Sequence, residues 1–217
     1  MKSLPIEAPR SYRSFSELLN HEVEGRDFKR IVRECDSHTA IVAPHGGGIE
    51  PGTSEIAKAL AGNEYSLYCF ESLKRDGNEI LHITSHEFDD PLCTRIMQSA
   101  KIVVSIHGCG CEEDKAGIFV GGRHGPLRRQ LITSLRKAGF EAISDDGRHP
   151  GIHTGNICNQ GQTGAGIQLE ISLGVRRSMF AGMSRVERQV TKPLFRTFVD
   201  TVRLSLETHN LFIRYLG

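Results

Sequence analysis

The chain has 217 residues, a formal net charge of +1 with neutral histidines, 38% hydrophobic residues and 24% charged residues. This length suits one hydrophobic core, so we expect a single domain over residues 1–217, with residues 1–25 as a loosely packed N-terminal extension. The near-neutral charge and the lack of a basic run argue against nucleic-acid binding, and no apolar stretch is long enough to span a membrane.

Elements of both kinds are expected in the first half of the chain, from apolar runs for strands and from amphipathic segments for helices. The helix at 54–61 is expected to have Thr53 as its N-cap and to end at Gly62. In chain order, we expect a helix at 15–20, a strand or turn at 27–32, a strand at 38–43, a helix at 54–61, strands at 66–70 and 81–84, and a helix at 90–99.

The second half of the chain continues this alternation. In chain order, we expect strands at 101–106 and 117–120, a helix at 126–138, a strand at 140–143, a polar loop at 144–166, a strand at 166–172, and a helix at 191–209. The alternation predicts an α/β fold with a largely parallel or mixed sheet between layers of helices.

Three polar side chains are expected at the carboxyl ends of strands. His45 follows the strand at 38–43, His107 follows the strand at 101–106, and Glu170 lies in the strand at 166–172. In open α/β sheets, ligands bind beyond the carboxyl ends of the strands. Such groups are costly to bury without a partner, so we expect a metal or a catalytic cluster there.

The segment His45-Gly-Gly-Gly-Ile-Glu50 suits a zinc site. Zinc binds imidazole nitrogen and carboxylate oxygen, and a catalytic zinc takes three protein ligands and leaves one position open. The strand would place His45 at the rim, the glycines would let the chain fold back to bring Glu50 to the same point, and His107 would supply the third ligand. His153 is the main alternative for the third position.

Glu170 is the candidate general base. Its neighbours Leu169 and Ile171 are expected to face a core, so that its own side chain faces the other way. A glutamate near the metal would take a proton from the attacking water and pass it to the leaving nitrogen. The alternative is a strand glutamate that pairs with a surface arginine.

Substrate recognition is expected from amides in the loop at 151–166 and from arginines near the pocket. Amide side chains suit peptide or carboxylate recognition, and arginine binds carboxylates in a bidentate manner. The candidates are Asn156, Asn159, Arg123 and Arg176. The alternatives are a loop that uses asparagine for its turns and arginines that are solvated surface groups. The remaining histidines of this region are interpreted as structural or surface residues: His82, His86 and His149.

Several segments resemble the poly-γ-glutamate hydrolase family of phages and bacilli: VAPHGGGIEPGTSEIA, VVSIHGCG, GIFVGG and GNICNQGQTGAGIQLEIS. The resemblance extends from about residue 25 to the end of the C-terminal helix. The family is similar in fold to zinc carboxypeptidases. This implies a three-layer α/β/α sandwich around a mixed, largely parallel central sheet.

The resemblance also implies a ligand set and a base. One Zn²⁺ per chain would be held by His45, Glu50 and His107, with Glu170 as the base. Carboxypeptidases place the glutamate three residues after the histidine, whereas here it follows after five, so the choice of Glu50 over Glu55 depends on the family resemblance. Glu55 lies inside the helix expected at 54–61 and should point elsewhere.

The activity implied by the resemblance is hydrolysis of γ-glutamyl amide bonds in poly-γ-glutamate by zinc-activated water. The partner would be a polyanionic polymer or peptide, with no nucleic acid and no membrane. Arginines would have to attract this substrate, and the candidates are Arg123, Arg128, Arg129, Arg176 and Arg177.

Two other functions stay open. One is another zinc amidase or carboxypeptidase-like hydrolase that acts on acylated amino acids or cell-wall peptides. The other is a non-enzymatic, phage replication-associated protein. The N-terminus has no apolar segment typical of secretory signal peptides, so we expect a cytoplasmic location, with release by phage lysis as a route to an extracellular polymer.

Overall fold

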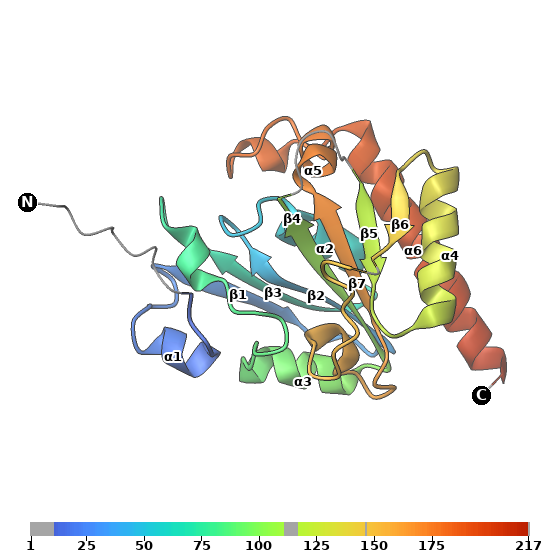
Figure 1. Cartoon of the computed structure of the whole chain (residues 1–217), viewed down its shortest axis with the longest axis horizontal. Helices are drawn as coiled ribbons and strands as arrows, with labels where there is room; N and C mark the ends of the chain where they lie inside the picture. Colours follow the sequence, from blue (N-terminus) through green and yellow to red (C-terminus); the bar gives the residue numbers. More distant parts are fainter. Residues whose placement is uncertain (1–10, 111–116, 146, 217) are drawn as a thin grey trace, which may run out of the picture.

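The computed structural model of the chain describes residues 11–110, 117–145 and 147–216. A seven-stranded sheet crosses these residues in the order β1-β3-β2-β4-β7-β5-β6 (Figure 1). The strands are β1 (Phe28–Arg33), β2 (Thr39–Gly46), β3 (Ser66–Ser72), β4 (Ile102–Cys109), β5 (Ile118–Gly121), β6 (Ala142–Ser144) and β7 (Ile167–Ser172). β1 is antiparallel to β3 and β5 is antiparallel to β7, whereas the other neighbours are parallel. The predicted mixed, largely parallel sheet is therefore confirmed.

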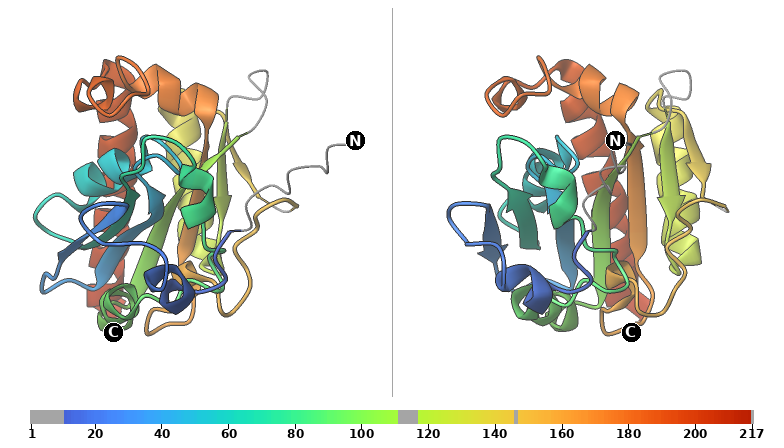
Figure 2. Two further views of the ribbon diagram at one scale, coloured as in Figure 1. Left: turned by 90° about the vertical axis from the view of Figure 1, so that its left-hand side faces the viewer. Right: turned by 60° about the vertical axis from the view of Figure 1, so that its left-hand side comes forward.

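Helices cover both faces of the sheet. They are α1 (Phe15–Leu19), α2 (Thr53–Ala61), α3 (Pro91–Ser99), α4 (Gly125–Lys137), α5 (Leu173–Met179) and α6 (Pro193–Leu216), with short 3₁₀ helices η1 (Asn78–Leu81), η2 (Ile157–Asn159) and η3 (Glu187–Gln189). Figure 2 shows helices on both sides of the sheet. Apolar side chains of α2, α4, α5 and α6 pack on one face, and those of α1 and α3 pack on the other. The predicted α/β/α layers are present, and α5, which follows β7 directly, was not expected.

Two apolar cores result from the alternation of side chains along the strands. In β4, Val104 and Ile106 belong to the core under α2 and α6, whereas Val103 belongs to the core under α3. In β7, Leu169 and Ile171 both face the first core, as predicted. Glu170, which lies between them on β7, therefore faces the opposite side of the sheet.

A crevice is expected where the chain changes direction across the sheet. The connection from β2 to β3 passes through α2 on one face, and the connection from β3 to β4 passes through α3 on the opposite face. The carboxyl ends of the neighbouring strands β2 and β4 therefore form a topological switch point, the usual place for a ligand in such sheets.

Two local expectations are wrong. Residues 81–84 do not form a strand, because Leu81 ends η1 and the Ile83 carbonyl accepts a hydrogen bond from His45 instead of a ladder partner. The alternation of Leu81 and Ile83 reflects burial of both side chains in the core under α3. Thr53 is not the N-cap of α2; Gly52 occupies that position with a φ of 101°, and the Thr53 hydroxyl donates to the Glu50 carbonyl.

The expected N-terminal extension is partly packed. Residues 1–10 lie outside the described residues, but Phe15 and Leu18 of α1 are buried in the core under α3. The segment that contains α1 is therefore attached to the domain through apolar contacts. Among the described helices, none combines the length and the apolar character that a membrane span requires.

Candidate metal centre

Three adjacent parallel strands carry the side chains predicted for the site. β4 lies between β2 and β7, and His107 of β4 is paired in the ladder with Glu170 of β7. His45 lies near the end of β2, and its Nδ1 is 3.1 Å from Nδ1 of His107. All three line one cavity of about 560 Å³. The predicted convergence at the carboxyl ends of the strands is present.

An irregularity in β2 directs His45 toward this cavity. Ala43 faces the core under α2, so a regular strand would send the residue two positions later to the same face. The register with β3 shifts between Ala43 and Gly46, and the His45 ring instead lies 6.4 Å from the ring of Phe88 in the other core. Bulges of this kind commonly redirect a side chain next to a functional site.

The loop after β2 returns Glu50 to His45. The Glu50 N–H donates to the His45 carbonyl at 2.8 Å, which closes the loop. Gly47 has a φ of 72°, and a Cβ there would lie 2.3 Å from the Ser72 carbonyl oxygen, so this position requires glycine. Glu50 Oε1 then lies 3.1 Å from His45 Nδ1, and Oε2 accepts the Gly108 N–H at 2.8 Å.

The hydrogen bonds of His45 indicate which ring nitrogen is free. Its Nε2 lies 2.7 Å from the Ile83 carbonyl, which only accepts, so Nε2 carries the hydrogen. In the neutral ring, Nδ1 then has a lone pair that faces Glu50 Oε1 and His107 Nδ1, each at 3.1 Å. A carbonyl that fixes the tautomer in this way is typical of metal-binding histidines. The three groups are therefore placed so that a cation could lie between them.

The donor set fits a divalent metal. In a tetrahedral zinc site with Zn–N bonds of about 2.0–2.1 Å, ligand atoms lie roughly 3.3 Å apart. His45 Nδ1 lies 3.1 Å from its two neighbours, and His107 Nδ1 lies 3.8 Å from Glu50 Oε2. Two imidazoles and one carboxylate are therefore spaced as a small cation requires.

The protonation states of His107 and Glu50 also suit metal binding. Burial lowers the pKa of His107 to about 3, so its ring is neutral near pH 7. Burial alone would raise the pKa of Glu50, but the neighbouring His45 ring and the Gly108 N–H lower it to about 2. Neutral imidazole and ionised carboxylate are the forms that bind metals.

His82 is a fourth candidate ligand, which the sequence interpretation treated as structural. Its ring stacks on His45 at 3.9 Å between centroids, and its Nε2 lies 3.8 Å from Glu50 Oε1. One ligand atom from each of His45, Glu50 and His82 lies within 4.8 Å of the others. His82 is half-exposed, whereas His107 is buried. The sequence offered a weak signal in the clustering of His82 with His86.

The other histidines line the rim of the cavity. His153, the alternative for the third ligand, contacts the His86 ring at 5.3 Å, and its Nδ1 accepts the Gly155 N–H. His149 also lines the cavity. Among the described residues, the group of three side chains whose ligand atoms all lie within 4.8 Å of one another is His45, Glu50 and His82; it includes neither His153 nor His107.

Glu170 is buried on the same wall of the cavity. Only 7% of the residue is exposed. Burial raises its pKa to about 8, with further contributions from the negative charges of Glu50 and Asp145, while Arg176 opposes the shift. The Gln168 side-chain amide donates to Glu170 Oε1 at 3.1 Å. Within residues 11–110, 117–145 and 147–216, no ion pair joins Glu170 to an arginine, so Glu170 is a buried carboxyl group with a pKa near neutral pH.

The two predicted asparagines differ in position. Asn156 lines the cavity, and its Nδ2 donates to Gln168 at 2.9 Å. Asn159 is buried; its Oδ1 accepts the Gly166 N–H, and its Nδ2 donates to the carbonyls of Gly151 and His153. Asn159 therefore has its hydrogen bonds satisfied within the loop that bounds the cavity.

The two predicted arginines do not line the cavity. Arg123 is exposed and follows β5, which runs antiparallel to β7, so it lies at the edge of the sheet away from Glu170. Arg176 of α5 is 3% exposed, and its guanidinium donates to the carbonyls of Pro51, Cys109 and Ile171. The expectation that Glu55 points elsewhere is confirmed, because it pairs with Arg188 at 2.9 Å.

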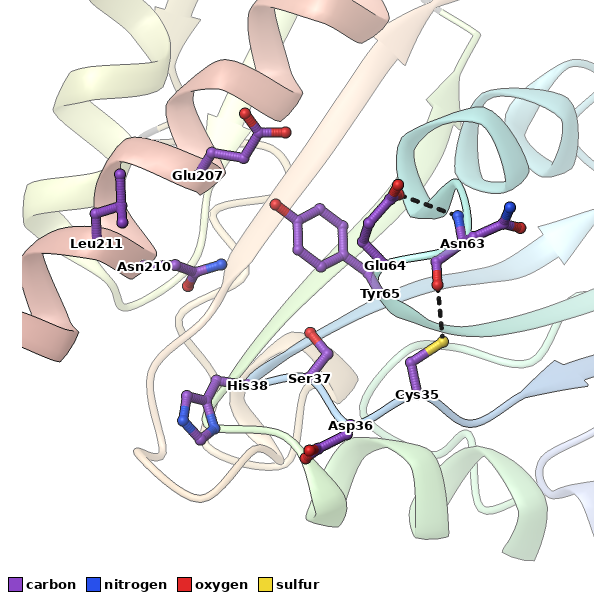
Figure 3. Close-up of a pocket in the computed structure, with 10 residues that line it drawn as sticks. All are labelled: Cys35, Asp36, Ser37, His38, Asn63, Glu64, Tyr65, Glu207, Asn210 and Leu211. Atoms are coloured by element: carbon purple, nitrogen blue, oxygen red, sulfur yellow. Dashed lines mark hydrogen bonds between the residues drawn. The ribbon is translucent and has the colours of Figure 1, made fainter.

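A second cavity, of about 600 Å³, lies at the amino ends of β2 and β3 (Figure 3), whereas His45 and His107 lie at the carboxyl ends of β2 and β4. It combines residues before β2, residues before β3 and the side chains of α6 that Figure 3 labels. Its Glu64 pairs with Arg203 at 2.9 Å. The described residues bring no three metal-binding side chains together there, whereas His45, Glu50 and His82 come together in the first cavity, which is called the histidine cavity below.

Sequence comparison shows the family. The sequence model of the family described as poly-gamma-glutamate hydrolase matches residues 12–201. The chain belongs to the poly-gamma-glutamate hydrolase family. It is therefore a hydrolytic enzyme, and the non-enzymatic alternative is set aside.

Individual relatives and solved structures are similar to this chain over most of its length. The chain is 42% identical over 183 residues to the UPF0714 protein YndL of Bacillus subtilis (strain 168), over 83% of this chain and 71% of that protein. A bacteriophage poly-gamma-glutamate hydrolase superimposes with a TM-score of 0.89 at 29% identity, over 93% of this chain and 99% of that one. The zinc-free form of YndL superimposes with a TM-score of 0.86 at 39% identity, over 91% and 98% of the two chains.

Proposed function

We propose that the chain is a zinc-dependent amidohydrolase that cleaves the γ-glutamyl amide bonds of poly-γ-glutamate. The observation that carries the proposal is the convergence of His45, Glu50 and His107 at separations of 3.1 to 3.8 Å in the cavity that holds Glu170. Family membership supports the substrate. The zinc-free form of YndL, which superimposes on this chain, supports zinc as the metal.

In this proposal His45, Glu50 and His107 hold the metal. Zinc bound there supplies a Lewis acid that polarises the scissile carbonyl and lowers the pKa of a water molecule. Two neutral rings and one carboxylate leave the centre positively charged, and the cavity beside it gives room for the amide. The Ile83 carbonyl and the Gly108 N–H keep His45 and Glu50 in place.

Glu170 is the general base of the proposed reaction. It takes a proton from the attacking water and returns a proton to the leaving nitrogen. Its pKa is raised to about 8, which is close to neutral pH, so the group can both accept and donate a proton. A divalent cation in the cavity would lower that pKa and favour the ionised carboxylate. The Gln168 amide holds Oε1 at 3.1 Å.

Metal analysis and a Glu170→Gln substitution test the proposal. We expect about one zinc per chain, and loss of poly-γ-glutamate cleavage on chelation with recovery on addition of zinc. Glu170→Gln should keep the zinc but lose roughly 10²–10⁴-fold in kcat, because only the proton transfer is removed. The measurements are atomic spectroscopy and the release of γ-glutamyl fragments.

The matched control is Glu34→Gln, which changes an exposed glutamate. It should leave both zinc content and cleavage unchanged. Protein that purifies without metal and does not respond to added zinc would contradict the zinc proposal. An active Glu170→Gln variant would place the general base elsewhere.

A further inference from the structure

The histidine cavity has one permanently charged cation in its described lining. Among the described residues that line this cavity, Arg148 is the only arginine, and none is a lysine. Arg148 is exposed, and the ion pairs between described residues do not include it. The guanidinium is therefore available to an anion that enters the cavity.

The backbone around Arg148 is fixed before any ligand arrives. The buried Asp145 carboxylate accepts the N–H groups of Gly147, Arg148 and His149 at 3.3, 3.1 and 3.2 Å. The His149 carbonyl accepts the Gln168 amide at 3.0 Å. A backbone held at this many points loses little entropy when a ligand binds, so the position from which the Arg148 side chain extends is pre-organised.

The same amide connects this loop to Glu170. Gln168 Nε2 donates both to the His149 carbonyl and to Glu170 Oε1, at 3.0 and 3.1 Å. Its Oε1 accepts the Asn156 amide at 2.9 Å. Arg148 therefore belongs to a segment whose position relative to the proposed base is set by direct hydrogen bonds.

The chemistry of a γ-linked polymer places an anion close to the bond that is cut. In poly-γ-glutamate, the scissile nitrogen is bonded to an α-carbon that carries a free carboxylate. In an α-linked chain, the same carbon carries the next peptide carbonyl, except at the C-terminal residue. This carboxylate must enter the cavity together with the scissile amide, and arginine is the side chain best shaped to bind it.

We propose that Arg148 binds the α-carboxylate on the amine side of the scissile γ-glutamyl bond, with His149 beside it. The inference rests on the proposed function, because it assumes that a γ-glutamyl amide occupies the cavity. Arg148 then selects γ-linked over internal α-linked glutamyl bonds. Arg123 and Arg176 cannot share this role, because neither lines the cavity.

A pair of substrates separates this role from a structural one. One is a γ-linked glutamate oligomer, and the other is the same oligomer with its α-carboxylates converted to carboxamides. For Arg148→Ala, we expect kcat/KM on the carboxylate oligomer to fall roughly 10- to 100-fold, as for the loss of a charge-assisted hydrogen bond. Cleavage of the carboxamide oligomer should change less than about 3-fold, and Arg148→Lys should lose less than Arg148→Ala.

The matched control is Arg196→Ala, which removes a charge from an exposed position on α6. It should change neither substrate's kcat/KM. An equal loss on both oligomers with Arg148→Ala, or no loss on either, would overturn the inference. Zinc content of Arg148→Ala should equal that of the unaltered protein.

A binding measurement separates failure of this inference from failure of the proposed function. The zinc-loaded protein is titrated calorimetrically with the γ-linked oligomer. Binding that weakens with Arg148→Ala, in a protein that cleaves neither oligomer, would refute the proposed cleavage of γ-glutamyl bonds. It would still support a carboxylate-binding role for Arg148. Binding that does not depend on Arg148 would overturn the inference whatever the activity.

Discussion

At the scale of single residues, His45 is the centre of the proposed metal site. Its Nε2 hydrogen is used by the Ile83 carbonyl, and its Nδ1 is 3.1 Å from both Glu50 and His107. The ring of His82 stacks on it from the cavity side. His45 therefore has two histidine neighbours of different burial, and the site has one more imidazole than a three-ligand zinc centre needs.

The two neighbours of His45 should differ in their effect on metal binding. We expect His107→Ala to weaken zinc binding by at least about 10²-fold, because it removes a buried ligand whose Nδ1 already faces the cluster. His82→Ala should weaken it less than about 10-fold, because His82 is half-exposed and stacks on His45. Zinc titration against a competing chelator measures both. The reverse order would make His82 the third ligand.

Residues at strand ends could be placed from the sequence, and residues in irregular segments could not. His45, His107 and Glu170 converge as predicted, because adjacent parallel strands bring their carboxyl ends to one edge. His82 and Arg148 were missed. Their positions depend on specific hydrogen bonds and ring contacts, such as the bond from the Gln168 amide to the His149 carbonyl beside Arg148. The periodicity of apolar residues does not predict such contacts.

At the scale of elements, α5 ties the strand ends together. The buried Arg176 guanidinium donates to the carbonyls of Pro51 after β2, Cys109 of β4 and Ile171 of β7. A Cβ at Gly108 would lie 2.5 Å from Arg176 Cζ, so the guanidinium packs directly against β4. One side chain thus links the three strands that carry the site. The sequence does not predict α5, because this short helix follows β7 without a loop.

The turn between β2 and α2 gives a prediction with a well-matched control. Gly47→Ala should destabilise the protein by more than about 3 kcal/mol and weaken zinc binding, because the added Cβ would lie 2.3 Å from the Ser72 carbonyl oxygen. Gly77 has nearly the same φ, 71° against 72°, but nothing lies within 4 Å of its added Cβ. Gly77→Ala should therefore cost only about 1–2 kcal/mol of backbone strain.

Urea denaturation and zinc titration measure the two variants. Because both alanines adopt the same unfavourable φ, the difference between them isolates the steric clash in the turn that carries Glu50. Equal destabilisation, with unchanged zinc binding in both, would show that the turn tolerates a side chain.

At the scale of the whole molecule, a buried acid makes stability depend on pH. The pKa of Glu170 is raised by burial to about 8, from 4.5 in an exposed glutamate. A carboxyl group with a raised folded-state pKa stabilises the fold fully below the unfolded-state pKa, and this contribution is lost as pH rises through the folded-state value. In metal-free protein the loss should fall between about pH 4.5 and pH 8.

The Glu170→Gln variant reports this effect. In chelator, the free energy of unfolding of Glu170→Gln relative to the unaltered protein should rise between pH 5 and pH 9 by a few kcal/mol, at about 1.4 kcal/mol per pKa unit. Urea denaturation at several pH values measures it. A difference between the two proteins that stays constant with pH would mean that Glu170 has an ordinary pKa.

The overall layout was more predictable than its details. Alternating apolar and amphipathic segments predicted the strands and helices, and the mixed sheet with helices on both faces is confirmed. The exception at residues 81–84 is instructive, because Leu81 and Ile83 alternate as in a strand but are buried under α3 without a ladder partner. Alternation of apolar and polar residues indicates which side chains are buried. Whether the segment forms a strand also depends on whether a neighbouring strand lies beside it in the folded chain.

The wide spacing of the site along the chain bears on how the protein is made. His45 and Glu50 leave the ribosome long before His107, and His107 long before Glu170. Each parallel pairing between β2, β4 and β7 must close a long loop before the strands can meet. A nascent chain thus presents the proposed ligands His45 and Glu50 early and the proposed base Glu170 last, so we expect no hydrolysis until the central strands have paired.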